Sequence, residues 1–449
     1  MTEWYDQLGK VAGLAAFLAV SLLAASCSPA GAAKGVASAP VSNFLNSLGI
    51  CTHIGQGVDG AAQSAAALAY AGVRDLRDDG SPSHVEDWIA VHKQAGVKVV
   101  LTASGPNDES IASLMDQSRK LAAAGALLAM EGPNELNNWG VTYQGQRSQA
   151  TETLMPVAKW QAAFYKAVKG DPVLKRYPVF HSSEAGGSEP DNVGLQFLTI
   201  PPGAGTLMPD GTKYADYANV HNYICRQPKI IDNMAWTNAD PTFEGWPDGI
   251  VAEYGKTWRK GFRGYSKAEL LKLPRVTTET GWVTGPKGIT EEEQGRLYLN
   301  LYLAQFKQGY KHTFIYMLRD AGGSDAGYGI VDTEYRPKVS ARYLHNLTTI
   351  LADPGPGARK GSLSYAIANQ PATVHDLLLR KSDGTYELVV WSEKVSGTSE
   401  VTVDLSAARA SVTVFDPTSG THPVRSLTKV RSVPLTLSDH PVVLEVKVP

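Results

Sequence analysis

Cysteine is scarce in this chain of 449 residues, which contains only three. Cys27 lies in the N-terminal segment, which leaves Cys51 and Cys225 for the rest of the chain. Two cysteines are too few for a disulfide scaffold, and neither has the short spacing to other ligands that a metal site needs. We expect two buried free thiols, with a single disulfide as the alternative if the protein is exported to an oxidising compartment.

A strong charge of one sign is also missing. The formal net charge is -2, and no basic run stands out. Proteins that bind nucleic acid or an anionic membrane surface carry basic patches or stripes, so the sequence argues against both classes of partner and favours a neutral ligand. The apolar share of 43% and the charged share of 19% are those of a globular protein with a large core.

Long hydrophobic runs are limited to one, from Val11 to Ala25, which is too short for a transmembrane helix. Small residues and Cys27 follow it, so we expect a signal peptide over residues 1–27. The segment LAASC, Leu23 to Cys27, resembles a bacterial lipoprotein processing box, which implies an outer-membrane lipoprotein anchored at Cys27. Ordinary cleavage into the periplasm or the extracellular space is the alternative. Residues 28–43 are rich in Ala, Gly, Ser and Pro and are predicted to form a tether.

Short apolar strands alternate with amphipathic helices from residue 44 to residue 352. Repeated units of this kind predict a parallel sheet, and eight of them predict a closed (β/α)8 barrel of the α/β class. A doubly wound open sheet is the competing fold, but no glycine-rich phosphate loop follows an early strand. The candidate strands cover residues 48–54, 73–79, 97–103, 126–132, 177–183, 217–223, 275–281 and 312–318.

The pattern changes at Asp353–Gly357, a cluster of Pro and Gly that neither helices nor strands tolerate. Beyond this cluster, apolar residues alternate with period two, and residues 376–394 indicate a hairpin that turns at Asp383-Gly384. We therefore predict a small antiparallel β-sandwich over residues 358–449. It either binds glycan or only packs on the barrel.

Two acids end strands on opposite sides of the predicted barrel, where the chemistry of such barrels is located. Glu135 follows the fourth strand and Glu279 lies in the seventh. Opposed carboxyls can split an acetal, because one donates a proton to the leaving oxygen while the other attacks the anomeric carbon or activates water. Glu131 is interpreted as a structural ion-pair or loop acid. Strand one, Thr52-His53-Ile54, lacks a His-x-His pair, so we expect neither a metal nor another cofactor.

Four short motifs at these strand ends resemble those of glycoside hydrolase clan A, the retaining glycosidases on an eight-stranded barrel, which include cellulase-like and β-xylosidase-like enzymes and exopolysaccharide hydrolases. The resemblance covers about residues 44–352. The motifs are Arg77 in LRDD, Asn134-Glu135, His221-Asn222-Tyr223, and Glu279 in TTETGW.

The resemblance implies a role for each motif. Glu135 would be the acid/base, and Asn134 would hold the 2-hydroxyl of the sugar. Glu279 would be the nucleophile, positioned by Tyr223 and kept ionised by a hydrogen bond from Arg77. The two carboxyls would then lie about 5 to 5.5 Å apart.

Aromatic and histidine side chains complete the predicted substrate site. Clan members commonly place a Trp under the sugar at strand eight, where this chain has Tyr316-Met317-Leu318, so Trp282 is expected as a substitute. His53 and His181 are expected to form subsite walls, and His221 to bind substrate with its neighbours. Trp139, in a polar loop, is expected to stack on a sugar ring.

The sequence is consistent with two functions. The first is a retaining glycoside hydrolase that cleaves β-glycosidic bonds of a polysaccharide or oligosaccharide by double displacement. Its predicted export and near-neutral charge favour a bacterial exopolysaccharide as the substrate. The alternative is a non-catalytic carbohydrate-binding or exopolysaccharide-assembly protein on the same barrel. The presence of both acids favours the enzyme.

Overall fold

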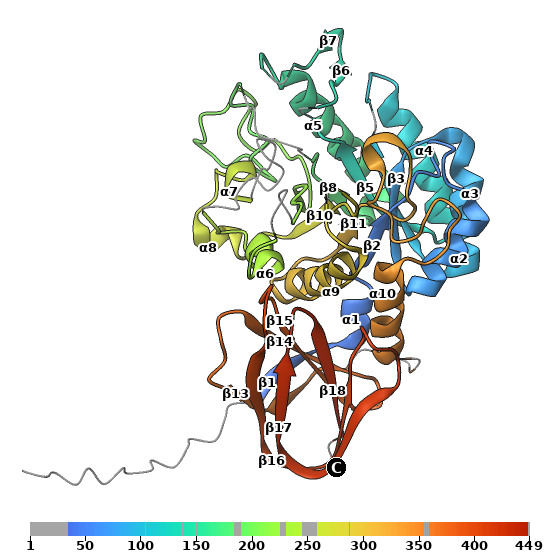
Figure 1. Cartoon of the computed structure of the whole chain (residues 1–449). Coiled ribbons are helices and arrows are strands. Elements are labelled where there is room, and N and C mark those ends of the chain that lie inside the picture. The colour runs from blue at the N-terminus through green and yellow to red at the C-terminus, as the bar shows by residue number, and fades with distance from the viewer. Residues whose placement is uncertain are drawn as a thin grey trace, which may run out of the picture.

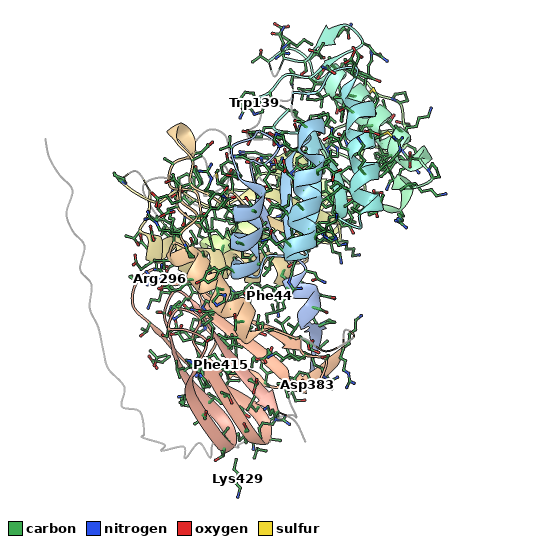
Figure 2. The ribbon with its side chains drawn as sticks, turned by 90° about the vertical axis from the view of Figure 1, so that its right-hand side faces the viewer. Phe44, Trp139, Arg296, Asp383, Phe415 and Lys429 are labelled. Atoms are coloured by element: carbon green, nitrogen blue, oxygen red, sulfur yellow. The ribbon has the colours of Figure 1, made fainter. Side chains whose placement is uncertain are left out.

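A computed structural model describes residues 35–447, apart from residues 104, 137, 150, 184–189, 225–229, 245–257, 287, 354, 356 and 358. The described chain forms a barrel and a second β-sheet domain beside it (Figure 1). Trp139 lies at the far end of the barrel, and Lys429 lies at the opposite end of the molecule, in the second domain (Figure 2). No helix in the described ranges is long and apolar enough to cross a membrane.

The barrel consists of eight parallel strands in the order β8-β5-β4-β3-β2-β11-β10-β9. A parallel bridge between Phe180 and Tyr217 joins the two ends of this order. The prediction of an eight-stranded parallel barrel is therefore confirmed, and the open sheet is excluded. The strands are β2 (Leu48–Cys51), β3 (Asp75–Asp79), β4 (Lys98–Ala103), β5 (Leu127–Pro133), β8 (Val179–Phe180), β9 (Ala218–Asn219), β10 (Arg275–Thr280) and β11 (Thr313–Ile315).

Helices cover the outside of the barrel and turn an apolar face toward it. Gly72 and Gly96 follow the helices that end at Ala71 and Ala95. Both have the left-handed conformation, with φ of 71° and 73°, which glycine adopts without steric cost. Thr290 and Glu293 form a capping box at the start of α9. The long helices are α2 (Ala61–Ala71), α3 (Val85–Ala95), α4 (Ser110–Ala123), α5 (Met155–Gly170), α9 (Glu291–Lys307) and α10 (Val339–Ile350).

Shorter elements lie in the connections. They are α6 (Met234–Ala239), α7 (Trp258–Gly261), α8 (Lys267–Leu270), the hairpin of β6 (Thr142–Tyr143) and β7 (Gln146–Arg147), and 3-10 turns at Pro82–His84, Leu174–Arg176 and Gly323–Asp325.

The second sheet has the order β12-β1-β14-β15-β18-β16-β13, with β17 paired to β16. The predicted hairpin is present as β14 and β15. The sheet is not wholly antiparallel, because β1 pairs with β14 in parallel. Its C-terminal strands are β12 (Gly361–Ser364), β13 (Ala366–Ala368), β14 (Val374–Arg380), β15 (Tyr386–Ser392), β16 (Ser399–Phe415), β17 (Pro423–Leu437) and β18 (Pro441–Lys447).

The N-terminal end of the described chain belongs to this second sheet. Residues 35–40, part of the predicted tether, form β1 (Gly35–Pro40), which pairs with β12 and β14. The following helix, α1 (Val41–Leu45), buries Val41 and Phe44. The tether prediction is thus wrong over residues 35–43. Its small residues resemble those of a linker, but here they let a strand fit closely between two others. Residues 1–34, with the predicted signal peptide and Cys27, lie outside the described residues.

Trp391 of β15 is a large side chain at the junction of the two domains. It is fully buried in the same core as the barrel helices, and its ring contacts Trp236 from α6 with centroids 6.2 Å apart. Its indole N–H donates to Glu393 Oε1 at 3.0 Å, while Glu393 Oε2 accepts the backbone N–H of Trp236 at 2.9 Å. The junction therefore combines apolar burial with hydrogen bonds at the start of α6.

Replacing Trp391 with Ala should lower the free energy of unfolding by about 3–5 kcal/mol, because the change leaves a cavity and removes a buried apolar surface. Urea unfolding followed by circular dichroism measures the loss. The matched control, Val424→Ala, alters a side chain that is 54% exposed and should change stability by less than about 0.5 kcal/mol. A loss below 1 kcal/mol for Trp391→Ala would contradict this account of the junction.

Candidate active site

A cavity of about 600 Å³ opens where the barrel strands end. It is lined by the carboxyl ends of several strands and the loops after them, which is the usual position of the active site in this fold. The described lining residues are Cys51, Thr52, His53, Gln56, Arg77, Asp78, Asp79, Asn134, Glu135, Trp139, Tyr223, Glu279, Tyr316, Asp325 and Tyr328.

Glu279, near the end of β10, has one hydrogen-bond donor on each carboxylate oxygen. Arg77 Nη1 donates to Oε1 at 2.8 Å, and the hydroxyl of Tyr223 donates to Oε2 at 2.8 Å. The side chain is almost entirely buried. Burial raises the pKa of Glu279 above its ordinary value, although the nearby charges of His221 and Arg77 and the Tyr223 hydrogen bond act in the opposite direction.

Arg77 is held between two buried carboxylates. Its Nε and Nη2 atoms donate to both oxygens of Glu131, at 2.7 and 3.0 Å, in the bidentate geometry that suits a guanidinium. Nη2 also donates to Asn134 Oδ1 at 2.7 Å. Because Glu131 fixes one edge of the guanidinium, Nη1 is directed at Glu279. Glu131 therefore is the structural ion-pair acid that its sequence context indicates.

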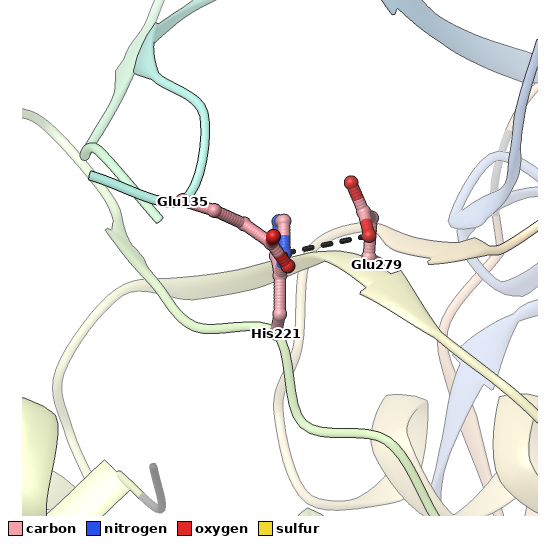
Figure 3. Close-up of side chains that lie close together, drawn as sticks. All are labelled: Glu135, His221 and Glu279. Atoms are coloured by element: carbon pink, nitrogen blue, oxygen red, sulfur yellow. Dashed lines mark hydrogen bonds and ion pairs between the residues drawn. The ribbon is translucent and has the colours of Figure 1, made fainter. Parts of the chain in front are cut away.

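Glu135 stands on a strained turn just after β5. Its φ is 40°, a conformation that residues with a side chain rarely adopt and that is concentrated at functional sites. Its backbone N–H donates to Ser183 Oγ at 3.0 Å, and its carboxylate accepts Asn138 Nδ2 at 2.9 Å on Oε2. The turn carries the side chain into the cavity toward Glu279 (Figure 3).

His221 lies between the two acids. Its Nδ1 is 3.0 Å from Glu135 Oε1 and 3.5 Å from Glu279 Oε2 (Figure 3). Its Nε2 is 3.1 Å from Thr278 Oγ1, whose hydroxyl lies 2.9 Å from Glu131 Oε1. When that hydroxyl donates to the Glu131 carboxylate, it can only accept a hydrogen bond from His221, so Nε2 must carry a proton. Nδ1 then faces the two acids.

The two acids influence each other's ionisation. Burial acts to raise the pKa of Glu135, but the hydrogen bond and charge of His221 outweigh it, so that the pKa falls below its ordinary value. An oxygen of Glu135 lies within 4.8 Å of one of Glu279, so the charge of each acid affects the other. Such acids titrate as a pair, and the ligand-free order does not fix which one is protonated when substrate is bound.

The same three side chains offer ligand atoms within 4.8 Å of one another, which is close enough to hold a metal ion. The buried guanidinium of Arg77, 2.8 Å from Glu279, opposes a second positive charge at this position.

Three of the predicted substrate-binding residues, His181, His221 and Trp282, are not among the residues that line the cavity. His221 is 3% exposed and contacts the two acids. Trp282 is only 6% exposed and hydrogen-bonds through its backbone to the hydroxyl of Tyr298 in α9. His181 is 2% exposed, with Nδ1 2.9 Å from Ser182 Oγ. The side chains of Trp282 and His181 therefore do not form the cavity walls that the sequence predicted for them. Tyr316, just after β11, takes the wall position expected for Trp282.

The other predicted substrate-binding residues line the cavity: Arg77, Asn134, Tyr223, His53 and Trp139. His53 lines it, with Nε2 3.4 Å from the hydroxyl of Tyr316. Trp139 lines it with 58% of its surface exposed, as a platform for a ring would. Sequence reasoning missed Gln56, Asp325 and Tyr328, which lie in loops whose residue pattern carries no periodic signal.

Cys51, at the end of β2, is buried and free. Burial raises the pKa of its thiol well above the ordinary value, which disfavours the nucleophilic thiolate. Its predicted counterpart, Cys225, lies outside the described residues.

No protein-family model and no curated protein matches the chain. Solved structures do. The GH51 arabinofuranosidase from Xanthomonas axonopodis pv. citri aligns with a TM-score of 0.53 and 13% identity over 92% of this chain and 100% of that one. The GH30 endoxylanase from Clostridium papyrosolvens C71 gives 0.51 and 11% over 93% and 97%, and SrfJ from Salmonella typhimurium gives 0.51 and 11% over 93% and 90%. The chain therefore has the fold of clan A glycoside hydrolases.

Replacing Glu131 with Gln should lower the free energy of unfolding by about 3–5 kcal/mol, because it leaves the buried Arg77 short of a negative charge. Urea unfolding of Glu131→Gln, Arg77→Met and the double variant measures the coupling. The double variant should lose less than the sum of the two single losses by at least about 1 kcal/mol. Additive losses would show that the two side chains do not stabilise each other.

Proposed function

We propose that this protein is a retaining glycoside hydrolase, which cleaves β-glycosidic bonds of a polysaccharide or oligosaccharide by double displacement. The observation that carries the proposal is the pair Glu135 and Glu279, whose oxygens approach within 4.8 Å in one cavity. Retaining enzymes hold their carboxyls about 5–5.5 Å apart, whereas inverting enzymes leave about 6.5–9.5 Å for a water molecule. The glycosidase fold supports the same function.

Glu279 is suited to the nucleophile. It is the more buried acid, and Arg77 and Tyr223 donate to its two oxygens, which stabilises the ionised form that attacks the anomeric carbon. When the glycosyl-enzyme bond forms, the charge on the attacking oxygen is lost and the remaining oxygen keeps its donor. Water then releases the sugar with its configuration retained.

Glu135 is suited to the acid/base. Its Oε1 lies 3.0 Å from His221 Nδ1, and its carboxyl projects into the cavity opposite Glu279. To act as the acid Glu135 must carry a proton, and the negative charge of Glu279 within 4.8 Å favours the protonated carboxyl. Once Glu279 is glycosylated, that charge is gone, the pKa of Glu135 falls, and Glu135 can act as the base for water.

Asn134 completes the sugar site. Its Oδ1 accepts from Arg77, which orients the amide and leaves Nδ2 as a donor inside the cavity. A sugar 2-hydroxyl at this point would accept that hydrogen bond, and such contacts strengthen in the transition state.

We further propose that the protein acts outside the cytoplasm on bacterial exopolysaccharide, as a secreted or periplasmic protein or as a lipoprotein anchored at Cys27. The apolar run Val11 to Ala25 and the segment LAASC support export. Radiolabelled fatty acid should be incorporated into the wild type and not into Cys27→Ser if the anchor exists.

Glu279→Ala should lower kcat/KM on aryl β-glycosides by at least roughly a thousandfold, because no covalent intermediate can form. Added azide should restore turnover and yield the α-glycosyl azide, since it attacks from the face that the missing carboxylate occupied. Glu135→Ala with azide should instead yield the β-glycosyl azide. NMR of the products distinguishes the anomers. Unchanged activity in Glu279→Ala would end the nucleophile assignment, and glycan binding without turnover by the wild type would favour the non-catalytic alternative.

Tyr223→Phe should move the acid limb of the kcat/KM profile to higher pH by roughly 0.5–1 unit. The phenolic hydrogen bond favours ionised Glu279, so its loss raises the pKa of a group that must be ionised. The alkaline limb should not move. Tyr165→Phe, which removes a hydroxyl from the outer face of the barrel, is the control. An acid limb that moves to lower pH, or stays, would refute the positioning role of Tyr223.

A further inference from the structure

The charges that line the cavity are almost all negative. Five acids line it, and Arg77 is the one Lys or Arg side chain among the described lining residues. Arg77 is 5% exposed, and its donors are directed at Glu131, Glu279 and Asn134. It has no free edge for a bidentate contact with a substrate carboxylate. A uronic acid in this cavity would lie among like charges without a partner, which costs affinity.

Most acids around this end of the barrel already have partners. Asp59 pairs with Arg319 at 2.7 Å, and Asp320 pairs with Lys338 at 3.0 Å. The buried Asp78 accepts hydrogen bonds from Thr52, Trp88 and three backbone N–H groups. These carboxylates are therefore explained by the fold itself.

Asp79, at the end of β3, is different. It lines the cavity and is only half-buried. Its Oδ2 accepts a hydrogen bond at 2.8 Å from the neutral side chain of Gln56. Within the described ranges, no Lys, Arg or His side chain forms an ion pair with it. Gln56 thus orients the carboxylate without neutralising its charge.

Asp325 brings a second carboxylate to the same side of the cavity. It lies in the loop after β11, and its side chain accepts a hydrogen bond from Tyr316. The strands β3 and β11 are the two neighbours of β2 in the barrel, so the two acids reach the cavity from either side of the β2 loop that carries His53. This wall offers a negative field to any ring bound against Glu279.

We propose that the substrate is a glycan of β-linked amino sugars with free amines, and that Asp79 binds the ammonium group of the sugar in this cavity, with Asp325 adding to the attraction. The inference rests on the proposed glycosidase function and specifies its substrate class. N-acetylation of the sugar would remove the positive charge that Asp79 binds, and a uronic acid would place a negative charge in the cavity instead.

The test compares kcat/KM for matched aryl β-glycosides of glucose, glucosamine, N-acetylglucosamine and glucuronic acid, and for the corresponding galactose series. We expect the free amino sugar to be preferred in one series and the uronide to be the poorest substrate. A charge-assisted hydrogen bond corresponds to roughly tenfold to a hundredfold. Asp79→Asn should therefore lower the ratio of amino-sugar to neutral-sugar kcat/KM by about tenfold or more, and Asp325→Asn by less.

Asp116→Asn provides the matched control, because it removes the same charge from α4, where the side chain is 58% exposed and outside the cavity. It should leave the ratio unchanged. If neutral or acidic sugars are preferred, or if Asp79→Asn leaves the ratio as it is, the amine proposal is wrong while the glycosidase stands. If no glycoside is cleaved, the proposed function fails, and calorimetric titration with the same sugar series still tests the charge preference.

Discussion

The contact between Arg77 and two buried carboxylates holds the candidate site together. Burying a guanidinium is costly unless its N–H donors are satisfied. Here Glu131 accepts hydrogen bonds from Nε and Nη2 of Arg77, and Glu279 accepts one from Nη1. These three side chains come from β3, β5 and β10, so a single ion cluster ties three strands together inside the barrel mouth. The position of the Glu279 carboxylate is a consequence of these contacts.

Glu131 also acts on the second acid, by a longer route. Its Oε1 accepts the hydroxyl of Thr278 at 2.9 Å, and Thr278 is the partner of His221 Nε2. This chain of hydrogen bonds sets which nitrogen of His221 keeps its proton, and the other nitrogen then faces Glu135. One buried carboxylate thus orients the cation beside Glu279 and the imidazole beside Glu135, although it faces neither the cavity nor a substrate.

The sequence was informative where a local pattern has one physical cause. Strands buried on both faces appear as apolar runs, and the acids that end them could be placed because parallel strands end at one rim. Prediction from the sequence failed where the structure of a segment depends on contacts with residues distant in the chain. Residues 35–40 resemble a linker, and only β12 and β14 make them a strand. The loop residues Asp325 and Tyr328 follow no period, so their arrival at the cavity could not be inferred.

Trp282 shows how the second domain bears on the site. Its backbone carbonyl accepts from Gln294 at 2.8 Å and from the hydroxyl of Tyr298 at 3.0 Å, both on α9. On the same helix, Asn300 donates to the backbone of Asp439, between β17 and β18 of the second domain, and Arg296 pairs with the Asp439 carboxylate at 3.1 Å. Trp282, in the loop after β10, is therefore anchored to a helix that also contacts the second domain. The side chain of Trp282 is buried there, whereas Tyr316, which is half-buried, lines the cavity.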